Sequence, residues 1–205
     1  MTPKAELKSK VFVVSAPSGC GKTTLCKKLL KDKCKLHQSV SITTRPPRRG
    51  ERNGADYFFV SAEEFIRMID AKELLEYEEN FGFLYGTPKK AVEDLLNKGK
   101  SVLLSIDVKG AMNVRKNYPR NSVLIFIMPP SMDELRKRLE SREADTPKAI
   151  LNRLKVARQE VAYKDRYDYV VVNDRLTAAY KKLKEVILLE GSTSPSKSKS
   201  SGMAS

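Results

Sequence analysis

The stretch SAPSGCGKTT, residues 15–24, has the glycine and lysine spacing of a loop that binds phosphate groups. Gly19 and Gly21 would let the backbone wrap tightly, so that successive amide hydrogens point at phosphate oxygens. Lys22 would place a positive charge near the β and γ phosphates of a nucleotide, and the Thr23 hydroxyl would be placed to ligate Mg²⁺. The stretch therefore predicts a nucleotide-binding site.

The residues on either side of this loop supply the structural context that phosphate binding needs. VFVV at 11–14 is typical of a buried parallel strand, and the apolar spacing after Lys22 predicts an amphipathic helix. The usual pattern begins with glycine where this chain has Ala16. A methyl group costs little there if the φ angle is negative, which we predict for Ala16. The alternative is a glycine-rich turn that binds no ligand.

A carboxylate at the end of a second apolar strand is the next candidate for chemistry. Asp107 ends the segment SVLLSID, 101–107. A carboxylate there can act on Mg²⁺ or on a bound ligand. It can equally serve as the N-cap of a helix over VKGAMNVRK. The sequence leaves both roles of Asp107 open.

Alternating helical and strand-like segments predict an α/β fold with a parallel sheet covered by helices on both faces. The apolar strands are expected at 11–15, 101–107, 122–128 and 167–173. Between 40 and 87 the chain has short β-prone pieces broken by the charged turn RPPRRGERNGAD, which predicts an inserted antiparallel lobe. Thr87 as N-cap and Pro88 as the first helical residue predict a helix over about 88–98.

The C-terminal part is expected to be mostly helical. Ser131 with Glu134, and Thr146, mark the starts of two arginine-rich helices, and an amphipathic helix is expected from residue 176 to about 189. The Ser/Lys-rich segment 191–205 has almost no apolar residues and is expected to be disordered.

Composition limits the function classes. The 205 residues are 40% hydrophobic and 31% charged, as in a globular protein, and carry a net charge of +14 that favours an anionic partner. No basic stretch is interleaved with aromatics, so specific nucleic-acid binding is not expected. No run approaches the roughly 20 apolar residues of a membrane span, and no secretory signal is visible, which predicts a cytoplasmic protein without a membrane partner. His37 is expected on the surface in a connector, and the three cysteines are expected to be reduced.

Six motifs, taken in order, resemble those of the guanylate kinase family. They are SAPSGCGKTT, SITTRPPRRGERNGADYFFV, LLEYEENFGFLYGT, SIDVKGAMNVR, PPSMDELRKRLESR and VVVND. The resemblance covers essentially residues 11–190. It implies transfer of the γ-phosphate of ATP to GMP, with Mg²⁺ as cofactor. It also implies a P-loop three-layer fold with a parallel sheet core, a small mixed-β GMP-binding lobe and a helical lid.

The resemblance also implies a division of the chain and a GMP site. The core would be 1–39, 88–132 and 161–190, the GMP lobe 40–87, the lid 133–160 and the disordered tail 191–205. The GMP-binding residues would be Ser41, Arg45, Arg48, Tyr57, Glu76, Tyr85, Thr87 and Asp107. A carboxylate at Glu76 can accept hydrogen bonds from guanine N1–H and the 2-amino group, which adenine cannot supply. Thr87 fits as a donor to guanine O6.

ATP would lie between the phosphate loop and the lid. The implied ATP-binding residues are Ser18, Gly19, Cys20, Gly21, Lys22, Thr23, Thr24, Arg138, Arg142, Asn173 and Asp174. The implied catalytic residues are Lys22, Arg48, Arg142 and Arg153, and the metal ligand is Thr23. Positioned cations stabilise the negative charge that spreads over the migrating phosphoryl group.

Two positions carry specific expectations. Ser105 stands where members of the family commonly carry an acidic residue, so Asp107 is expected to act without a second carboxylate. Cys20 would lie at a helix N-terminus, where the pKa of a thiol is lowered, and is expected to be open to oxidation or alkylation.

Three alternatives to a guanylate kinase remain at this stage. A kinase for another nucleoside monophosphate is disfavoured by Glu76 and Thr87. A guanylate-kinase-like binding module without catalysis is disfavoured by the intact Lys22 and Thr23. Nucleic-acid binding would rest on the net charge of +14 alone. The expected partners are GMP and ATP, and the expected oligomeric state is a monomer or weak dimer.

Overall fold

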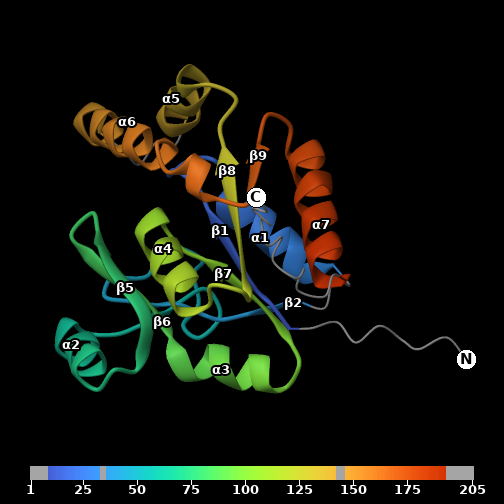
Figure 1. The fold of residues 1–205 in the computed structure, drawn as a ribbon. Helices are drawn as coiled ribbons and strands as arrows, with labels where there is room; N and C mark the ends of the chain where they lie inside the picture. Colours follow the sequence, from blue (N-terminus) through green and yellow to red (C-terminus); the bar gives the residue numbers. More distant parts are fainter. Residues whose placement is uncertain (1–8, 33–35, 142–145, 193–205) are drawn as a thin grey trace, which may run out of the picture.

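The computed structural model describes residues 9–32, 36–141 and 146–192. Within these ranges the central sheet has five parallel strands in the order β2-β7-β1-β8-β9 (Figure 1). They are β2 Leu36–Gln38, β7 Ser101–Ser105, β1 Val11–Ser15, β8 Ser122–Met128 and β9 Tyr169–Val172. Val13 of β1 lies beside Leu104 on one side and Leu124 on the other. The expected parallel sheet is confirmed, and its middle strand leads directly into the phosphate loop.

Apolar side chains on both faces of this sheet build the core. Phe12 and Val14 belong to one buried cluster, whereas Val11 and Val13 belong to a second, as the alternation of side chains along a strand requires. Helices α1 and α7 cover the first face, and α3 and α4 cover the second (Figure 1). These helices are α1 Lys22–Lys31, α7 Leu176–Ser192, α3 Lys89–Asn97 and α4 Val108–Asn117. The fold therefore has three layers.

A second sheet, at the lower left of Figure 1, forms the lobe between residues 40 and 88. Its order is β4-β3-β6-β5, and its elements are β3 Ile42–Thr43, β4 Phe58–Phe59, α2 Ala62–Asp70, β5 Leu74–Asn80 and β6 Phe83–Pro88. Strands β3 and β4 are parallel, whereas β6 is antiparallel to both β3 and β5, so the sheet is mixed. The Ser61 hydroxyl accepts a hydrogen bond from the Glu64 amide at 3.1 Å, the predicted cap of α2.

Two helices follow β8 and lie at the top of Figure 1: α5 Met132–Glu140 and α6 Pro147–Val161, with the short 3₁₀ helix η1 Lys164–Arg166 after them. The hydroxyls of Ser131 and Thr146 accept hydrogen bonds from the amides of Glu134 and Ala149, so both predicted caps are confirmed. The two helices contact each other and lie at the end of the sheet where β8 ends.

The predicted start of α3 is wrong. The helix begins at Lys89 with Pro88 as its N-cap residue, and Thr87 belongs to β6. Thr87 does not cap the helix because its hydroxyl donates to the carboxylate of Glu76 instead. The Thr87 side chain is therefore positioned by its bond to Glu76 and not by the start of α3.

Two further differences concern short or terminal segments. His37 lies in the edge strand β2 and not in a connector, because three residues are too few to show a strand pattern in the sequence. Helix α7 extends to Ser192, so the first two residues of the segment 191–205 are helical; the remainder lies outside the described residues. None of the helices in the described ranges has the length and apolar character that a bilayer crossing requires.

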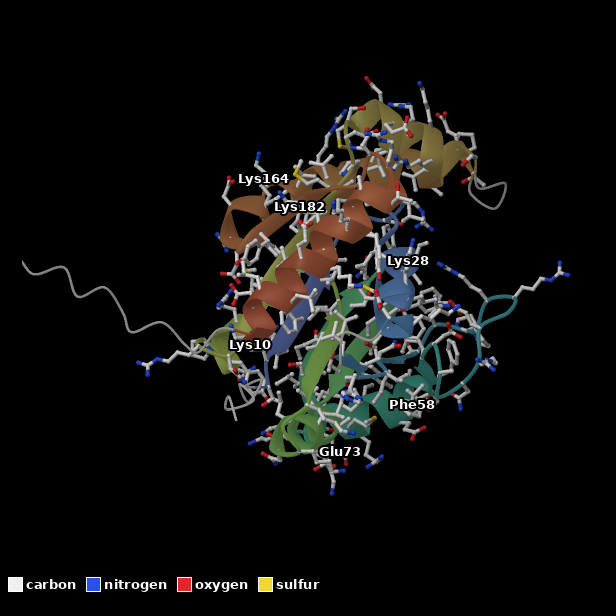
Figure 2. All side chains as sticks on the ribbon, turned by 90° about the vertical axis from the view of Figure 1, so that its right-hand side faces the viewer. Lys10, Lys28, Phe58, Glu73, Lys164 and Lys182 are labelled. Carbon is white, nitrogen blue, oxygen red and sulfur yellow. The ribbon has the colours of Figure 1, made fainter. Side chains whose placement is uncertain are left out.

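Figure 2 labels four lysines, of which Lys28 and Lys182 are exposed. Lys10, just before β1, is instead nearly buried, and its ammonium binds the Glu190 carboxylate at 2.5 Å, which ties the start of the sheet to the end of α7.

Candidate active site

The segment between β1 and α1 has the backbone that the phosphate-binding pattern requires. Gly19 and Gly21 have φ angles of 95° and 83°, a region that residues with a side chain rarely adopt. The non-glycine residues with positive φ in the described chain are Lys72 and Phe81. The φ angle of Ala16 is therefore negative, as predicted, and alanine is accommodated there without strain.

Three of the residues expected at ATP form a network behind this loop. The side-chain amide of Asn173 donates to the Cys20 carbonyl at 2.8 Å. Arg138 of α5 donates to the carbonyls of Asn173 at 2.9 Å and Asp174 at 3.3 Å. A Cβ atom at Gly21 would lie 2.6 Å from Asn173 Nδ2, so glycine is needed there for space as well as for φ. The end of β9 thus holds the loop in place.

The expected reactivity of Cys20 is wrong. Its side chain is 0% exposed and belongs to the buried cluster that contains Leu135 and Leu139 of α5. A thiol reagent cannot reach it because the loop directs this side chain into the core. Cys26 is also buried, and neither cysteine forms a disulfide with a described residue.

A cavity of about 220 Å³ lies between the phosphate loop, the second sheet and α6. It brings together members of both expected substrate sites: Ser18, Lys22, Thr23, Ser41, Arg48, Tyr57, Glu76, Tyr85, Asp107 and Arg153. The other described candidates do not line it: Gly19, Cys20, Gly21, Thr24, Arg45, Thr87, Arg138, Asn173 and Asp174. Arg142 lies outside the described residues.

Lys22 supplies a cation to the cavity. Its ammonium donates to the carbonyl of Ile106, just beyond the end of β7, at 2.8 Å. Burial lowers the pKa of Lys22, and the negative charges of Asp107, Glu160 and Glu76 act in the opposite direction. A phosphate oxygen could replace the Ile106 carbonyl as the acceptor for the Lys22 ammonium. An ammonium group forms a stronger hydrogen bond with a charged oxygen than with a neutral carbonyl.

Glu76 of β5 is a buried carboxylate, 6% exposed. The Thr87 hydroxyl of the neighbouring strand donates to its Oε1 at 2.5 Å. Burial raises the pKa of Glu76 to about 7; the Thr87 hydrogen bond lowers it, and the charge of Asp107 raises it further. Because one hydrogen bond uses only part of the carboxylate's acceptor capacity, Glu76 can still accept hydrogen bonds from a ligand.

Of the two roles that the sequence left open for Asp107, the structure confirms the helix cap, and the role toward a ligand or metal stays a prediction. Its Oδ1 accepts a hydrogen bond from the Gly110 amide at 2.8 Å and so caps α4, and the residue also lines the cavity. Ser105 lines the cavity without a carboxylate, as expected. Besides Asp107, the carboxylates of Glu76 and Glu78 from β5 and of Glu160 from α6 line the cavity. Whether Asp107 acts alone on a metal ion stays a prediction. Burial raises the pKa of Glu160 to about 7.

Arg48, Tyr57 and Tyr85 form the part of the cavity suited to a phosphate monoester. The two phenol rings lie with centroids 6.1 Å apart, and burial raises the pKa of Tyr57, which keeps that phenol protonated as a donor. Arg45 differs from the other three, because its guanidinium donates two hydrogen bonds, at 3.0 and 2.9 Å, to the carboxylate of Glu51. In this structure Arg45 braces the turn that carries Arg48.

The oxygen donors of the cavity suit a hard divalent cation. Thr23 supplies a hydroxyl, and Asp107 and Glu160 supply carboxylates. Mg²⁺ prefers such ligands and usually keeps several waters, with one or two protein oxygens and the phosphates of its nucleotide completing the set. Within the described part of the chain no three His, Cys, Asp or Glu side chains form a metal site by themselves. The oxygen donors of Thr23, Asp107 and Glu160 fit a magnesium ion whose other ligands would be water and nucleotide phosphates.

The family model described as Guanylate kinase matches residues 8–190. The chain belongs to the guanylate kinase family. Guanylate kinases of Oceanobacillus iheyensis and Desulfitobacterium hafniense are each 46% identical to it, over 89% and 88% of this chain and 88% and 90% of those proteins. The crystal structure of guanylate kinase from Anaplasma phagocytophilum is similar, with a TM-score of 0.79 and 37% identity over 92% of this chain and 89% of that chain.

Several residues of this guanylate kinase family member line the cavity although the motifs did not single them out: Glu78, Asn80, Phe81, Ile106 and Glu160. Glu78 and Asn80 alternate with Glu76 along β5, so strand periodicity could have placed them on one face. No local signal marks Glu160, because its position depends on how α6 crosses the sheet. The sequence also did not indicate that Glu51 binds Arg45, because Glu51 is one of several charged residues in the same turn.

Gly110, in the first turn of α4, is needed for close approach. A Cβ atom there would lie 2.4 Å from Glu76 Oε2 and 3.3 Å from Asp107 Oδ1. We expect Gly110→Ala to displace the Glu76 carboxylate and to raise KM for GMP at least about tenfold, while KM for ATP changes less. Steady-state kinetics with each nucleotide varied would show this, with the exposed Lys116→Ala of the same helix as control. An unchanged KM for GMP would contradict the account.

Proposed function

We propose that this chain transfers the γ-phosphoryl group of ATP to GMP, giving ADP and GDP. The observation that carries the proposal is that one cavity contains both Lys22 of the phosphate loop and Glu76, a buried carboxylate on the other lobe. Membership of the guanylate kinase family supports it. A phosphate-binding loop alone would fit many nucleotide-binding proteins, whereas a buried carboxylate beside it selects for a base with adjacent hydrogen-bond donors.

The guanine base is proposed to bind at Glu76, with Ser41 and Asp107 as neighbours. An ionised Glu76 accepts from N1–H and the 2-amino group of guanine, while adenine would direct an N1 lone pair at the carboxylate. Thr87 was expected to donate to O6. Its hydroxyl instead donates to Glu76 in this structure, so we propose that Thr87 orients the carboxylate.

The GMP phosphate is proposed to bind Arg48, Tyr57 and Tyr85, with Arg45 in support. A phosphate oxygen of GMP then attacks the γ-phosphorus of ATP, the bond from that phosphorus to the β,γ-bridging oxygen breaks, and ADP leaves. Lys22, Arg48 and Arg153 lie around the cavity and would stabilise the charge on the migrating group by positioned cationic donors. Arg142 is proposed to join them.

The ATP side is proposed to use the amides of residues 18–24, with Arg138, Asn173 and Asp174 behind the loop. Mg²⁺ held by the ATP phosphates and the Thr23 hydroxyl would neutralise negative charge on those phosphates. We propose that residues 40–87 act as a GMP lobe and 133–160 as a lid that closes on the core formed by 1–39, 88–132 and 161–190. A cavity built by one chain supports action as a monomer or weak dimer, and we propose a cytoplasmic location.

Acceptor specificity tests the proposal directly. We expect ADP to form from ATP when GMP is present and to fall to background without it, and we expect kcat/KM for AMP, UMP and dTMP to be lower by about 10³-fold or more, because those bases leave the buried Glu76 without matching donors. A coupled assay of ADP formation measures both. Equal rates with all four acceptors would contradict the guanine assignment, and no transfer to any of them would contradict the proposed function.

A further inference from the structure

Phe81, at the tip of the hairpin between β5 and β6, has an unusual backbone. Asn80 pairs with Phe83, so the loop contains only Phe81 and Gly82, and their φ angles are 52° and 78°. Two positive φ angles are characteristic of the type I′ turn, in which Asn-Gly is the favoured sequence. A bulky aromatic residue with positive φ is a genuine outlier. Such strain persists where the side chain has a use that outweighs it.

The side chain of Phe81 lies where it can act on the lid. Phe81 is 46% exposed as a residue, yet it lines the substrate cavity. The guanidinium carbon of Arg153, from α6, lies 5.2 Å from the ring centroid, within the range of a cation–π contact. The same guanidinium donates through Nη1 to the Ser18 hydroxyl of the phosphate loop at 2.8 Å. Arg153 thus joins three segments: the lid helix, the phosphate loop and the GMP-lobe hairpin.

An aromatic ring suits this position for a chemical reason. A carboxylate in place of the Phe81 ring would compete with a nucleotide for the guanidinium, as Glu51 occupies that of Arg45. The face of a ring attracts the cation without accepting hydrogen bonds in the guanidinium plane. Phe81 can therefore hold the direction of Arg153 without competing with a nucleotide.

The hairpin also connects this contact to the guanine site. Glu76 and Glu78 on β5 and Tyr85 on β6 line the same cavity as Phe81. The two strands are paired from Leu74–Pro88 to Asn80–Phe83, so a movement of the hairpin toward GMP carries its tip with it. The position of the ring relative to α6 consequently depends on how the lobe sits over the cavity.

We propose that Phe81 is a positioning residue that holds Arg153 over the phosphate loop when the GMP lobe closes, so that GMP binding aligns a lid cation for phosphoryl transfer. The inference rests on the proposed function, because GMP is the ligand that moves the hairpin. Phe81 itself makes no contact with the reacting atoms and acts through Arg153.

The test compares Phe81→Asn with Phe81→Tyr. Asn-Gly is the favoured type I′ pair, so Phe81→Asn should raise the unfolding midpoint while it lowers kcat about tenfold, the rate equivalent of one partly desolvated cation–π contact. Saturation with both nucleotides isolates kcat from binding, and KM for GMP should change less than about threefold. Phe81→Tyr keeps the ring and should retain most of kcat. Ile66→Asn, at an exposed apolar residue of α2 in the same lobe, is the matched control.

A double-mutant cycle with Arg153→Ala decides whether Phe81 acts through Arg153. We expect Phe81→Asn to lower kcat in the parent and to have little further effect in the Arg153→Ala background. Equal effects in both backgrounds, an unchanged kcat in Phe81→Asn, or an equal loss in Phe81→Tyr would each overturn the proposal. A parent protein that transfers no phosphate to GMP would instead refute the proposed function, so the two failures are distinguishable.

Discussion

We expect Lys22→Met to lower kcat for phosphoryl transfer to GMP by about 10³-fold, the loss that follows when one preorganised charge donor is removed from a closed site. No other described lysine lines the cavity. Methionine keeps the length and apolar stem of lysine but removes the charge. The burial that lowers the pKa of Lys22 also makes its attraction for phosphate oxygens stronger than it would be in water.

The measurement is single-turnover transfer to GMP, so that slow product release does not hide the chemical step. Lys31→Met, on the exposed end of the same helix, is the control and should match the parent. Folding is checked by circular dichroism, because Lys22 also offsets the negative charges of Asp107, Glu160 and Glu76. A folded Lys22→Met variant with the parent's rate would show that the loop does not act on the transferred phosphate. A parent as inactive as this variant, with both folded, would favour the binding-module alternative.

Glu76→Gln should lower kcat/KM for GMP about 100-fold. Hydrogen bonds to a charged acceptor contribute roughly 1.5–3 kcal/mol each, and the glutamine amide would also direct N–H groups at the donors of guanine. KM for ATP should change little, because Glu76 lies on the second sheet, which we propose binds GMP. Kinetics with GMP and with AMP show whether the discrimination between the two bases collapses. Retained preference for GMP would contradict the role of Glu76.

The same substitution should stabilise the ligand-free protein, with a definite pH dependence. Glu76 has a pKa of about 7 in the folded protein against an ordinary 4.5, so between these pH values the folded state holds a proton that the unfolded chain releases. The stability from that proton is complete below about pH 4.5 and is lost as the pH rises through 7. Glutamine is neutral throughout, so Glu76→Gln should gain up to about 3 kcal/mol over the parent at pH 8 and much less at pH 5. Denaturant unfolding at the two pH values measures this, and a constant difference would contradict it.

Features that depend on neighbouring residues were predictable from the sequence. The turn at Gly19 and Gly21, the caps at Ser61, Ser131 and Thr146, and the central-sheet strands other than β2 follow from local backbone preferences and apolar patterns. Those preferences depend only on residues a few positions apart, so a short stretch of sequence is enough to predict the feature. The negative φ of Ala16 belongs to the same class.

Features that depend on how distant segments meet were not predictable from the residues. Glu160 reaches the cavity because α6 lies beside it, and Cys20 is buried because α5 packs behind the loop. At Thr87 a local sequence preference competes with a contact to a residue on another strand. A local rule favours it as a helix cap, but the bond to the buried Glu76 satisfies a carboxylate whose isolation would cost more than an exposed cap gains.

The hydrogen bond from Asn173 to the Cys20 carbonyl has a consequence for synthesis on the ribosome. The loop that would hold ATP is made first, and the side chain that fastens it comes about 150 residues later along the chain. Protein chains emerge at roughly 5–20 residues per second, so this fastening is absent for on the order of ten seconds. During that interval a nascent chain carries the full phosphate-binding motif without the clamp that sets its shape. We therefore expect tight nucleotide binding only after Asn173 has been translated and has reached the loop.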